Sequence, residues 1–143
     1  MKLVLAALLA LGLSCAAIAN DDSLPKNCKQ TKFEGWEVDY LFGYTCFYPN
    51  KTIAQVYADY RSAKEGDVAE RLRKVWKEKL AIDANLSYEV ALFDDEPENK
   101  ASLSYIWRDK NEVEVNLYLG SEETYTFRRK KDGVEVEYLF SRD

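Results

Sequence analysis

Histidine is absent from this chain of 143 residues. Its absence excludes the Ser–His and Cys–His pairs that activate many enzyme nucleophiles, and it removes a common nitrogen ligand of zinc. Glycine and proline are scarce, with six and three residues, and the sequence contains neither a P-loop nor a G-x-G-x-x-G motif. Because no nucleophile can be paired with a base, we expect a non-catalytic protein that holds no metal or cofactor.

Positive charge is in the minority. The chain has 20 Lys and Arg against 25 Asp and Glu, a formal net charge of −5. An acidic chain repels a polyanion, so nucleic acid is not expected as a partner. The dense basic run over residues 128–131 lies beside Asp132 and is interpreted as a solvated hairpin turn. The acidic run over residues 94–98 contains Pro97 and lacks the spacing of a calcium-binding loop, so it is also interpreted as a turn.

A long apolar run occurs only near the N-terminus. Lys2 is the one charge ahead of an apolar stretch over residues 3–13, and Ala17 and Ala19 form an A-x-A site. This pattern predicts a secretory signal peptide over residues 1–19, cleaved after Ala19. The apolar stretch is too short to cross a bilayer as a helix. The mature protein is therefore expected to be periplasmic or secreted, without a transmembrane segment.

Cys15 gives a second interpretation of the same segment. Residues 11–15 resemble a bacterial lipobox, in which the cysteine is lipidated and becomes the new N-terminus. Both interpretations predict export, and both remove Cys15 as a free thiol. Cys28 and Cys46 then remain, and two cysteines in an oxidising compartment are expected to form a disulfide.

Alternating and helical patterns locate the expected secondary structure. Aromatic and β-branched residues occupy alternate positions over residues 33–48, which predicts a strand. Thr52 is expected to cap a helix that ends at Gly66. Asp67 is expected to cap a second helix that runs to Leu80 and carries one apolar stripe. The helical pattern is most regular in this second segment.

The sequence from residue 86 to residue 140 alternates in five short runs separated by turns. It predicts an antiparallel β-meander with one buried face and one wet face. The turn lengths set five apolar pairs across neighbouring strands: Trp107 with Val113, Tyr105 with Val115, Leu117 with Tyr125, Val115 with Phe127, and Phe127 with Val136. On the wet face the same register sets a row of charges across three strands: Glu114, Arg128 and Glu135.

These elements predict an α+β fold of two layers. A curved antiparallel β-meander of five to six strands packs on two helices, and the strand over residues 33–48 joins an edge of the sheet or covers one end. The domain spans residues 31–143 and follows a polar lead-in over residues 20–30. The predicted arrangement resembles the cystatin-like and NTF2-like architectures in shape, and no motif in the sequence identifies a family.

The aromatic segment gives the main indication of function. Protein interfaces are rich in aromatic side chains, and this segment carries more of them than one buried face needs. We therefore predict a small exported binding protein of the inhibitor or immunity type, whose partner is another extracytoplasmic protein. The candidate binding surface consists of Phe33, Trp36, Leu41 and Phe47.

Two alternatives stay open. The first is a small-molecule carrier or an enzyme with a pocket between the sheet and the helices, lined by Tyr57, Trp76, Tyr105 and Trp107. The second is a structural envelope lipoprotein anchored through Cys15. A cavity among the four aromatic residues would favour the first alternative, whereas a lipid on the exported chain would favour the second.

Overall fold

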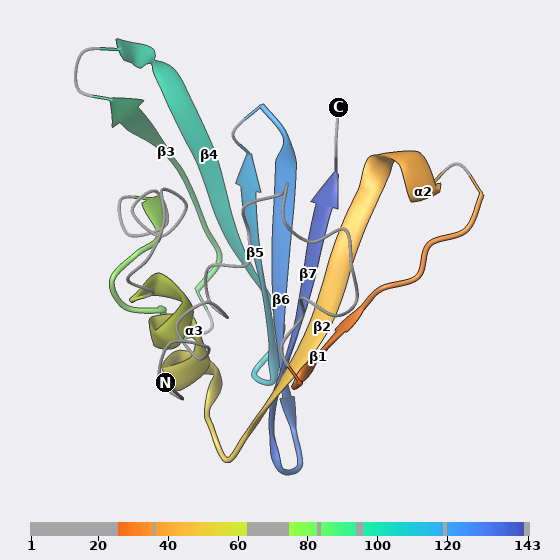
Figure 1. The fold of residues 1–143 in the computed structure, drawn as a ribbon. Coiled ribbons are helices and arrows are strands. Elements are labelled where there is room, and N and C mark those ends of the chain that lie inside the picture. The colour runs from red at the N-terminus through yellow and green to blue at the C-terminus, as the bar shows by residue number, and fades with distance from the viewer. Residues whose placement is uncertain are drawn as a thin grey trace, which may run out of the picture.

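Seven strands form one antiparallel sheet in the computed structural model, in the order β1-β2-β7-β6-β5-β4-β3 (Figure 1). The structure describes residues 26–35, 37–62, 75–82, 84–93, 96–118 and 120–141, so the predicted signal peptide lies outside the described residues. The strands are β1 (Cys28–Gln30), β2 (Leu41–Pro49), β3 (Leu86–Phe93), β4 (Glu96–Asp109), β5 (Glu112–Tyr118), β6 (Glu122–Lys130) and β7 (Gly133–Ser141). The described helices are α2 (Glu37–Tyr40) and α3 (Ile53–Arg61). Neither of these described helices is long and apolar enough to cross a membrane.

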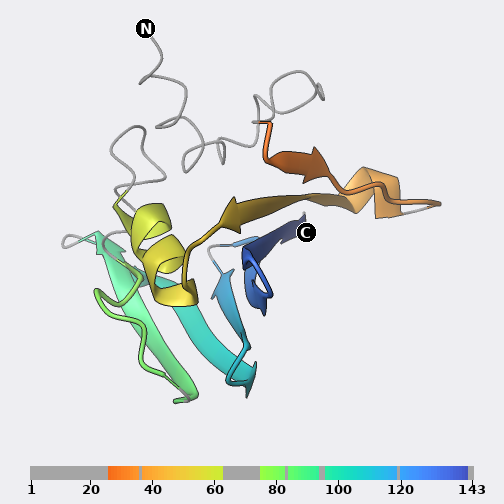
Figure 2. The same ribbon diagram turned by 90° about the horizontal axis from the view of Figure 1, so that it is seen from below.

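The predicted antiparallel sheet is confirmed, with seven strands in place of five to six. Strands β3 to β7 form a meander in which each strand is hydrogen-bonded to the next. Strand β2 pairs with β7 along its full length, and β1 pairs with β2 at one edge of the sheet. Figure 2 shows the sheet curving around α3, while the chain around α2 projects away from the rest of the described molecule.

The prediction that the sheet packs on two helices is wrong. Of the second predicted helix, residues 67–74 lie outside the described part of the chain, and the described residues 76–80 are not helical. The backbone of Lys77 is held instead by two tyrosines. Its N–H donates to the hydroxyl of Tyr105 at 2.9 Å, and its carbonyl accepts from the hydroxyl of Tyr57 at 2.6 Å. These hydrogen bonds hold the backbone of Lys77 in a non-helical conformation, so the apolar periodicity did not decide the conformation.

The prediction of one strand over residues 33–48 is wrong in its first half. Gly35 adopts a φ of 63° and makes a turn ahead of α2. A positive φ of this size is accessible to glycine at no steric cost. The strand begins only at Leu41, where β7 supplies a hydrogen-bonding neighbour. The alternation of aromatic residues therefore predicted a strand correctly only where another strand lies beside it.

The predicted disulfide between Cys28 and Cys46 is present. Cys28 of β1 lies directly opposite Cys46 of β2, with their Cα atoms 4.0 Å apart. The end of the segment expected to be a polar lead-in thus forms the edge strand β1. The disulfide fastens this strand of three residues to the sheet, because so short an edge strand has few ladder hydrogen bonds of its own.

Helix α3 begins as predicted, with Thr52 as its N-cap. The Thr52 hydroxyl accepts from the N–H of Gln55, and the Gln55 side chain accepts from the N–H of Thr52, which is a capping box. The helix ends at Arg61, before the predicted Gly66. Its buried residues recur at intervals of three and four: Ile53, Val56, Tyr57 and Tyr60. The rings of Tyr57 and Tyr60 pack against Phe127 and Tyr125 of β6, so α3 covers the concave face of the sheet.

Three of the five predicted apolar pairs are confirmed: Trp107 with Val113, Tyr105 with Val115, and Phe127 with Val136. The two predicted pairs between β5 and β6 are wrong, because Leu117 lies opposite Glu123 and Val115 lies opposite Tyr125. A shift of two residues keeps every side chain on its expected face. Glu123 lies on the core side with Tyr125 and takes the position opposite Leu117, where it is 7% exposed and accepts a hydrogen bond from the hydroxyl of Tyr138 at 2.8 Å.

The predicted charge row on the outer face is wrong at one end, since Glu112 and not Glu114 lies opposite Arg128. The Arg128 guanidinium contacts Glu112 at 2.8 Å, Glu137 at 3.3 Å and Glu135 at 3.4 Å. One cation therefore joins three strands. The outer face of β5, β6 and β7 is a polar surface whose charges are paired with one another.

Candidate functional site

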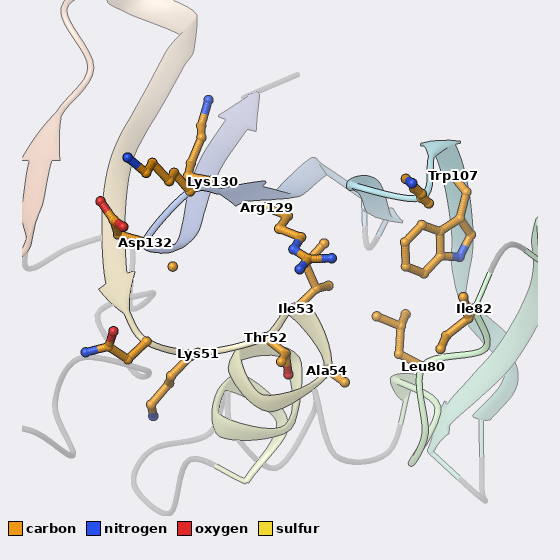
Figure 3. Close-up of a pocket in the computed structure, with 14 residues that line it drawn as sticks. Lys51, Thr52, Ile53, Ala54, Leu80, Ile82, Trp107, Arg129, Lys130 and Asp132 are labelled. Carbon is orange, nitrogen blue, oxygen red and sulfur yellow. The ribbon is translucent and has the colours of Figure 1, made fainter.

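A groove with a volume of about 450 Å³ opens at the end of the sheet where α3 begins. Four segments surround it (Figure 3): the start of α3 with the turn before it, the chain around Leu80 and Ile82, the β4–β5 turn, and the β6–β7 hairpin. We call this hollow the basic groove, after the cations described below. It combines a concave shape with apolar and charged side chains, and it is therefore the candidate site.

The floor of the basic groove is apolar. Ile53 is buried, and the half-buried side chains of Leu80 and Trp107 pack against the core. Ile82 is 74% exposed. Figure 3 shows Leu80, Ile82 and Trp107 gathered on one side of the hollow, across from Arg129. Removing apolar surface of this kind from water favours ligand binding by about 25 cal/mol per Å² of surface buried.

The rim of the basic groove is positively charged. Five cations line it against the single carboxylate of Asp132: Lys51, Lys110, Arg129, Lys130 and Lys131. Lys51 forms an ion pair with Asp59, and Lys130 lies 3.8 Å from Glu135. For the other three, Lys110, Arg129 and Lys131, no acidic group lies within 4.0 Å among the described residues. An otherwise acidic chain thus concentrates unpaired positive charge around one hollow.

Hydrogen bonds between backbone groups hold the walls of the groove together. The N–H of Asn50 donates to the carbonyl of Asp132 at 2.8 Å and joins the turn before α3 to the β6–β7 hairpin. The N–H of Arg129 donates to the carbonyl of Asn111 at 2.7 Å and joins that hairpin to the β4–β5 turn. These contacts prepare the groove before any ligand arrives, which lowers the ordering cost of binding.

Gly133 sets the close approach of two walls. A Cβ atom at this position would lie 2.2 Å from the carbonyl oxygen of Tyr48 and 2.9 Å from Cα of Pro49. Only a residue without a side chain lets the hairpin lie this close to β2. The shape of the groove at this corner therefore depends on a glycine that the turn motif Lys131-Asp132-Gly133 already contained.

The structure describes three of the four residues predicted as a binding surface. Phe47 is 38% exposed on the outer face of β2, and its ring leans towards Gly133. The ring of Phe33 approaches Gly43, and Leu41 is half-buried. Trp36 lies outside the described residues. None of these three described residues lines the basic groove.

Three of the four residues predicted to line a pocket pack together, with Trp76 and Tyr105 both in contact with Tyr57. The rings of Tyr57 and Trp76 stack with centroids 4.9 Å apart, and the hydroxyls of Tyr57 and Tyr105 are 2.7 Å apart. All three side chains are at most 3% exposed. Trp107 lies apart from them and faces the basic groove. The space expected between sheet and helix is filled by the aromatic side chains themselves.

Burial raises the pKa of the hydroxyls of these tyrosines. Desolvation raises the pKa of Tyr57 to about 12, although its hydrogen bond with Tyr105 acts in the opposite direction. Burial likewise raises the pKa of Tyr105 and of Tyr88. A hydroxyl of this kind holds its proton at neutral pH. Its role here is to hold the segment 75–77 by hydrogen bonds, since Tyr88 donates to the carbonyl of Val75.

The basic groove was missed by sequence reasoning. The run over residues 128–131 was interpreted as a solvated turn, and the hairpin is confirmed, with Lys131 and Asp132 at its tip. What the sequence did not indicate is that Lys51 and Lys110 come from distant positions to the same hollow. Trp107 was assigned to a pocket, and it does line one, but on a different side of the core.

The described residues include no group of three or more Cys, Asp and Glu side chains placed to hold a metal ion. The basic groove combines cations, an indole and aliphatic side chains, which is a chemistry suited to binding an anionic ligand with an apolar part. Comparisons with protein-family models, with curated proteins and with solved structures find no match to this chain.

Proposed function

We propose that this chain is a small exported binding protein without catalytic activity, and that it recognises another extracytoplasmic protein through the basic groove. The disulfide between Cys28 and Cys46 agrees with an oxidising compartment. The N-terminal pattern over residues 1–19 supports export. An inhibitor or immunity protein fits this description, because such proteins act by occupying a partner rather than by chemistry.

The observation that carries the proposal is the position of Arg129 opposite Trp107 across an open hollow (Figure 3). Tryptophan and arginine are the residue types that most often dominate the free energy of protein interfaces. Here they are held by hydrogen bonds from the backbone of Arg129 and the indole of Trp107. A rigid hollow with these two residue types is a suitable recognition site for a protein segment.

The carrier alternative receives less support from the packing. The space assigned to its ligand is occupied by Tyr57, Trp76 and Tyr105. A ligand at that position would have to displace stacked rings and break the hydrogen bonds that they make. The lipoprotein alternative concerns the anchor and is tested separately, because the intact mass of the exported chain differs when Cys15 carries lipid.

The experiment is a capture assay with the oxidised exported protein as bait in an extracytoplasmic extract of its own source. Arg129→Glu reverses a charge inside the groove. Lys29→Glu makes the same change in net charge on β1, outside the groove, and is the matched control. We expect a stoichiometric partner that binds the wild-type protein and the Lys29 variant and is lost with the Arg129 variant. A partner retained by both variants, or no partner with any bait, contradicts the proposal.

A further inference from the structure

We infer that the occupant of the basic groove is an acidic peptide segment that carries an apolar side chain. This inference rests on the proposed function and names the chemistry that the groove recognises. Carboxylates of the segment would contact Lys110, Arg129 and Lys131, and its apolar side chain would cover the floor beside Trp107 and Ile82.

The charges around the groove favour an anion. Lys110, Arg129 and Lys131 have no acidic partner within 4.0 Å among the described residues, although the whole chain carries a net charge of −5. Clustered charge of one sign attracts its counterpart over about one Debye length, roughly 8–10 Å at moderate salt. The acidic remainder of the protein repels an anion elsewhere. An acidic segment is therefore directed to this groove in preference to other surfaces.

Arg129 is placed to make the central contact. Figure 3 shows its side chain extending into the hollow towards Ile53, whereas Lys130 and Lys51 extend away from the centre. A guanidinium donates two parallel hydrogen bonds to a carboxylate, which adds direction as well as charge. The backbone of Arg129 is fixed by its hydrogen bond to Asn111 at 2.7 Å. One carboxylate is thus expected at Arg129, with further acidic groups towards Lys110 and Lys131.

The floor of the groove favours a ligand with an apolar part over a simple anion. Ile82 is 74% exposed, next to Leu80 and Trp107. The volume of about 450 Å³ falls within the range of roughly 300–1,000 Å³ that is usual for ligand sites. A free phosphate would leave most of this volume and the whole apolar side unused. A peptide segment supplies both carboxylates and an apolar side chain at neighbouring positions.

A polyanion such as nucleic acid does not fit the same surface. A nucleic acid needs positive charge along a stripe that follows its backbone. Here the unpaired cations surround one hollow, and the neighbouring outer face carries Glu112, Glu135 and Glu137 around Arg128. The surface next to the groove therefore repels a continued run of phosphates. A short acidic segment avoids this repulsion.

The test uses a blocked peptide of alternating aspartate and leucine as the probe. Titration into the wild-type protein, followed by calorimetry, is compared with titration of two matched peptides. In one, asparagine replaces every aspartate; in the other, serine replaces every leucine. We expect both replacements to weaken binding by about tenfold or more, because each removes one of the two features that the groove recognises. Equal binding of all three peptides, or no binding of the first, overturns the inference.

Variants locate the contact. We expect Arg129→Gln and Ile82→Ser each to weaken binding of the aspartate–leucine peptide by about tenfold. Both side chains are exposed, so folding is checked by circular dichroism and is expected to be unchanged. Lys29→Gln, on β1, is expected to bind as the wild type does. Binding that survives both groove variants overturns the inference.

Other occupants give different results. Binding of decanoate or inorganic phosphate at the groove without binding of the peptide overturns the inference in favour of a small anion. Self-association that Arg129→Gln abolishes overturns it in favour of a second copy of this chain. If the capture assay yields a partner that depends on Arg129 and the peptide neither binds nor competes, the inference fails while the proposed function stands. If the peptide binds at the groove and the capture assay yields no partner, the inference stands and the proposed function fails.

Discussion

The indole N–H of Trp107 donates to the carbonyl oxygen of Ala81 at 2.9 Å. The backbone N–H of Trp107 also donates to Oδ1 of Asn85, again at 2.9 Å. Strand β4 is thereby joined to the chain on both sides of Ile82. Trp107 therefore has two roles: its polar atoms position the apolar side of the basic groove, and its ring forms part of the floor.

Trp107→Phe is expected to loosen this side of the groove. The substitution keeps an aromatic ring and removes the donor to Ala81, so we expect a loss of about 1 kcal/mol in the free energy of unfolding. Urea unfolding measures that loss. Hydrogen exchange is expected to accelerate at residues 80–82 and to stay unchanged in the β6–β7 hairpin. Unchanged exchange at residues 80–82 would show that the hydrogen bond does not position this segment.

Reduction of the disulfide between Cys28 and Cys46 is expected to destabilise the fold. The two cysteines are 18 residues apart, and closing a loop of this length stabilises by roughly 3 kcal/mol in the chain-entropy model. Denaturant unfolding of oxidised and reduced protein measures the difference. Peptide binding at the basic groove is expected to persist in the folded reduced protein. Strand β1 lies at the edge of the sheet and contributes no residue to the groove. Loss of binding on reduction would contradict this separation.

Alkaline pH is expected to unfold the protein through its buried tyrosines. Burial raises the folded-state pKa of Tyr57 to about 12, above its unfolded value near 10. The folded state therefore favours the protonated hydroxyl, so this contribution to stability is complete below pH 10 and is lost as pH rises towards 12. Burial acts in the same direction on Tyr60 and Tyr125.

Absorbance at alkaline pH reports tyrosine ionisation, and circular dichroism reports unfolding. We expect both transitions to coincide for the buried tyrosines. Tyr57→Phe is expected to lower stability at neutral pH, since the hydroxyl contacts Lys77 and Tyr105, and to flatten the loss between pH 10 and 12. Full ionisation of the tyrosines in a protein that remains folded would refute the burial argument.

The hydroxyl of Tyr138 and the carboxylate of Glu123 are expected to be coupled in stability. A hydrogen bond to a charged acceptor contributes roughly 1.5–3 kcal/mol, and this one is buried with an oxygen–oxygen distance of 2.8 Å. Tyr138→Phe is expected to lose that amount in the wild-type background and less in a Glu123→Gln background. A double-mutant cycle by denaturant unfolding measures the coupling. Additive losses would mean that the two groups act independently.

Local signals in the sequence predicted those elements whose cause is local. Thr52 with Gln55 forms the capping box that starts α3, and the apolar residues at three- and four-residue spacing mark its buried side. Hairpins such as the one with Lys131 and Asp132 at its tip followed from turn residues between alternating runs. The disulfide was predicted because export removes Cys15 as a free thiol and leaves two cysteines, Cys28 and Cys46, to pair.

Elements decided by distant residues could not be predicted in this way. Residues 76–80 carry a helical pattern, yet the hydroxyls of Tyr57 and Tyr105 bind the backbone of Lys77 and replace helical hydrogen bonds. The register of β5 on β6 was predicted from apolar pairing. It failed because Glu123, which shares the core-facing side of β6 with Tyr125 and is held there by Tyr138, takes the position opposite Leu117.

The candidate site is the clearest case of a non-local feature. Its cations come from three separated parts of the chain: Lys51, Lys110 and residues 129–131. Each of them looks like an ordinary solvated turn when the sequence is considered alone. Only the sheet order, which places the β4–β5 turn beside the β6–β7 hairpin, brings them together around Trp107.

Zero-length carbodiimide cross-linking of the captured complex tests the central claim most directly, because it joins a lysine only to a carboxylate in contact with it. The account predicts cross-links from Lys110 and Lys131 in the groove to acidic residues of the partner, located by mass spectrometry. Lys29 and Lys100 lie outside the groove and are expected to give none. Cross-links confined to Lys29 or Lys100, with Lys110 and Lys131 unmodified, would contradict the account.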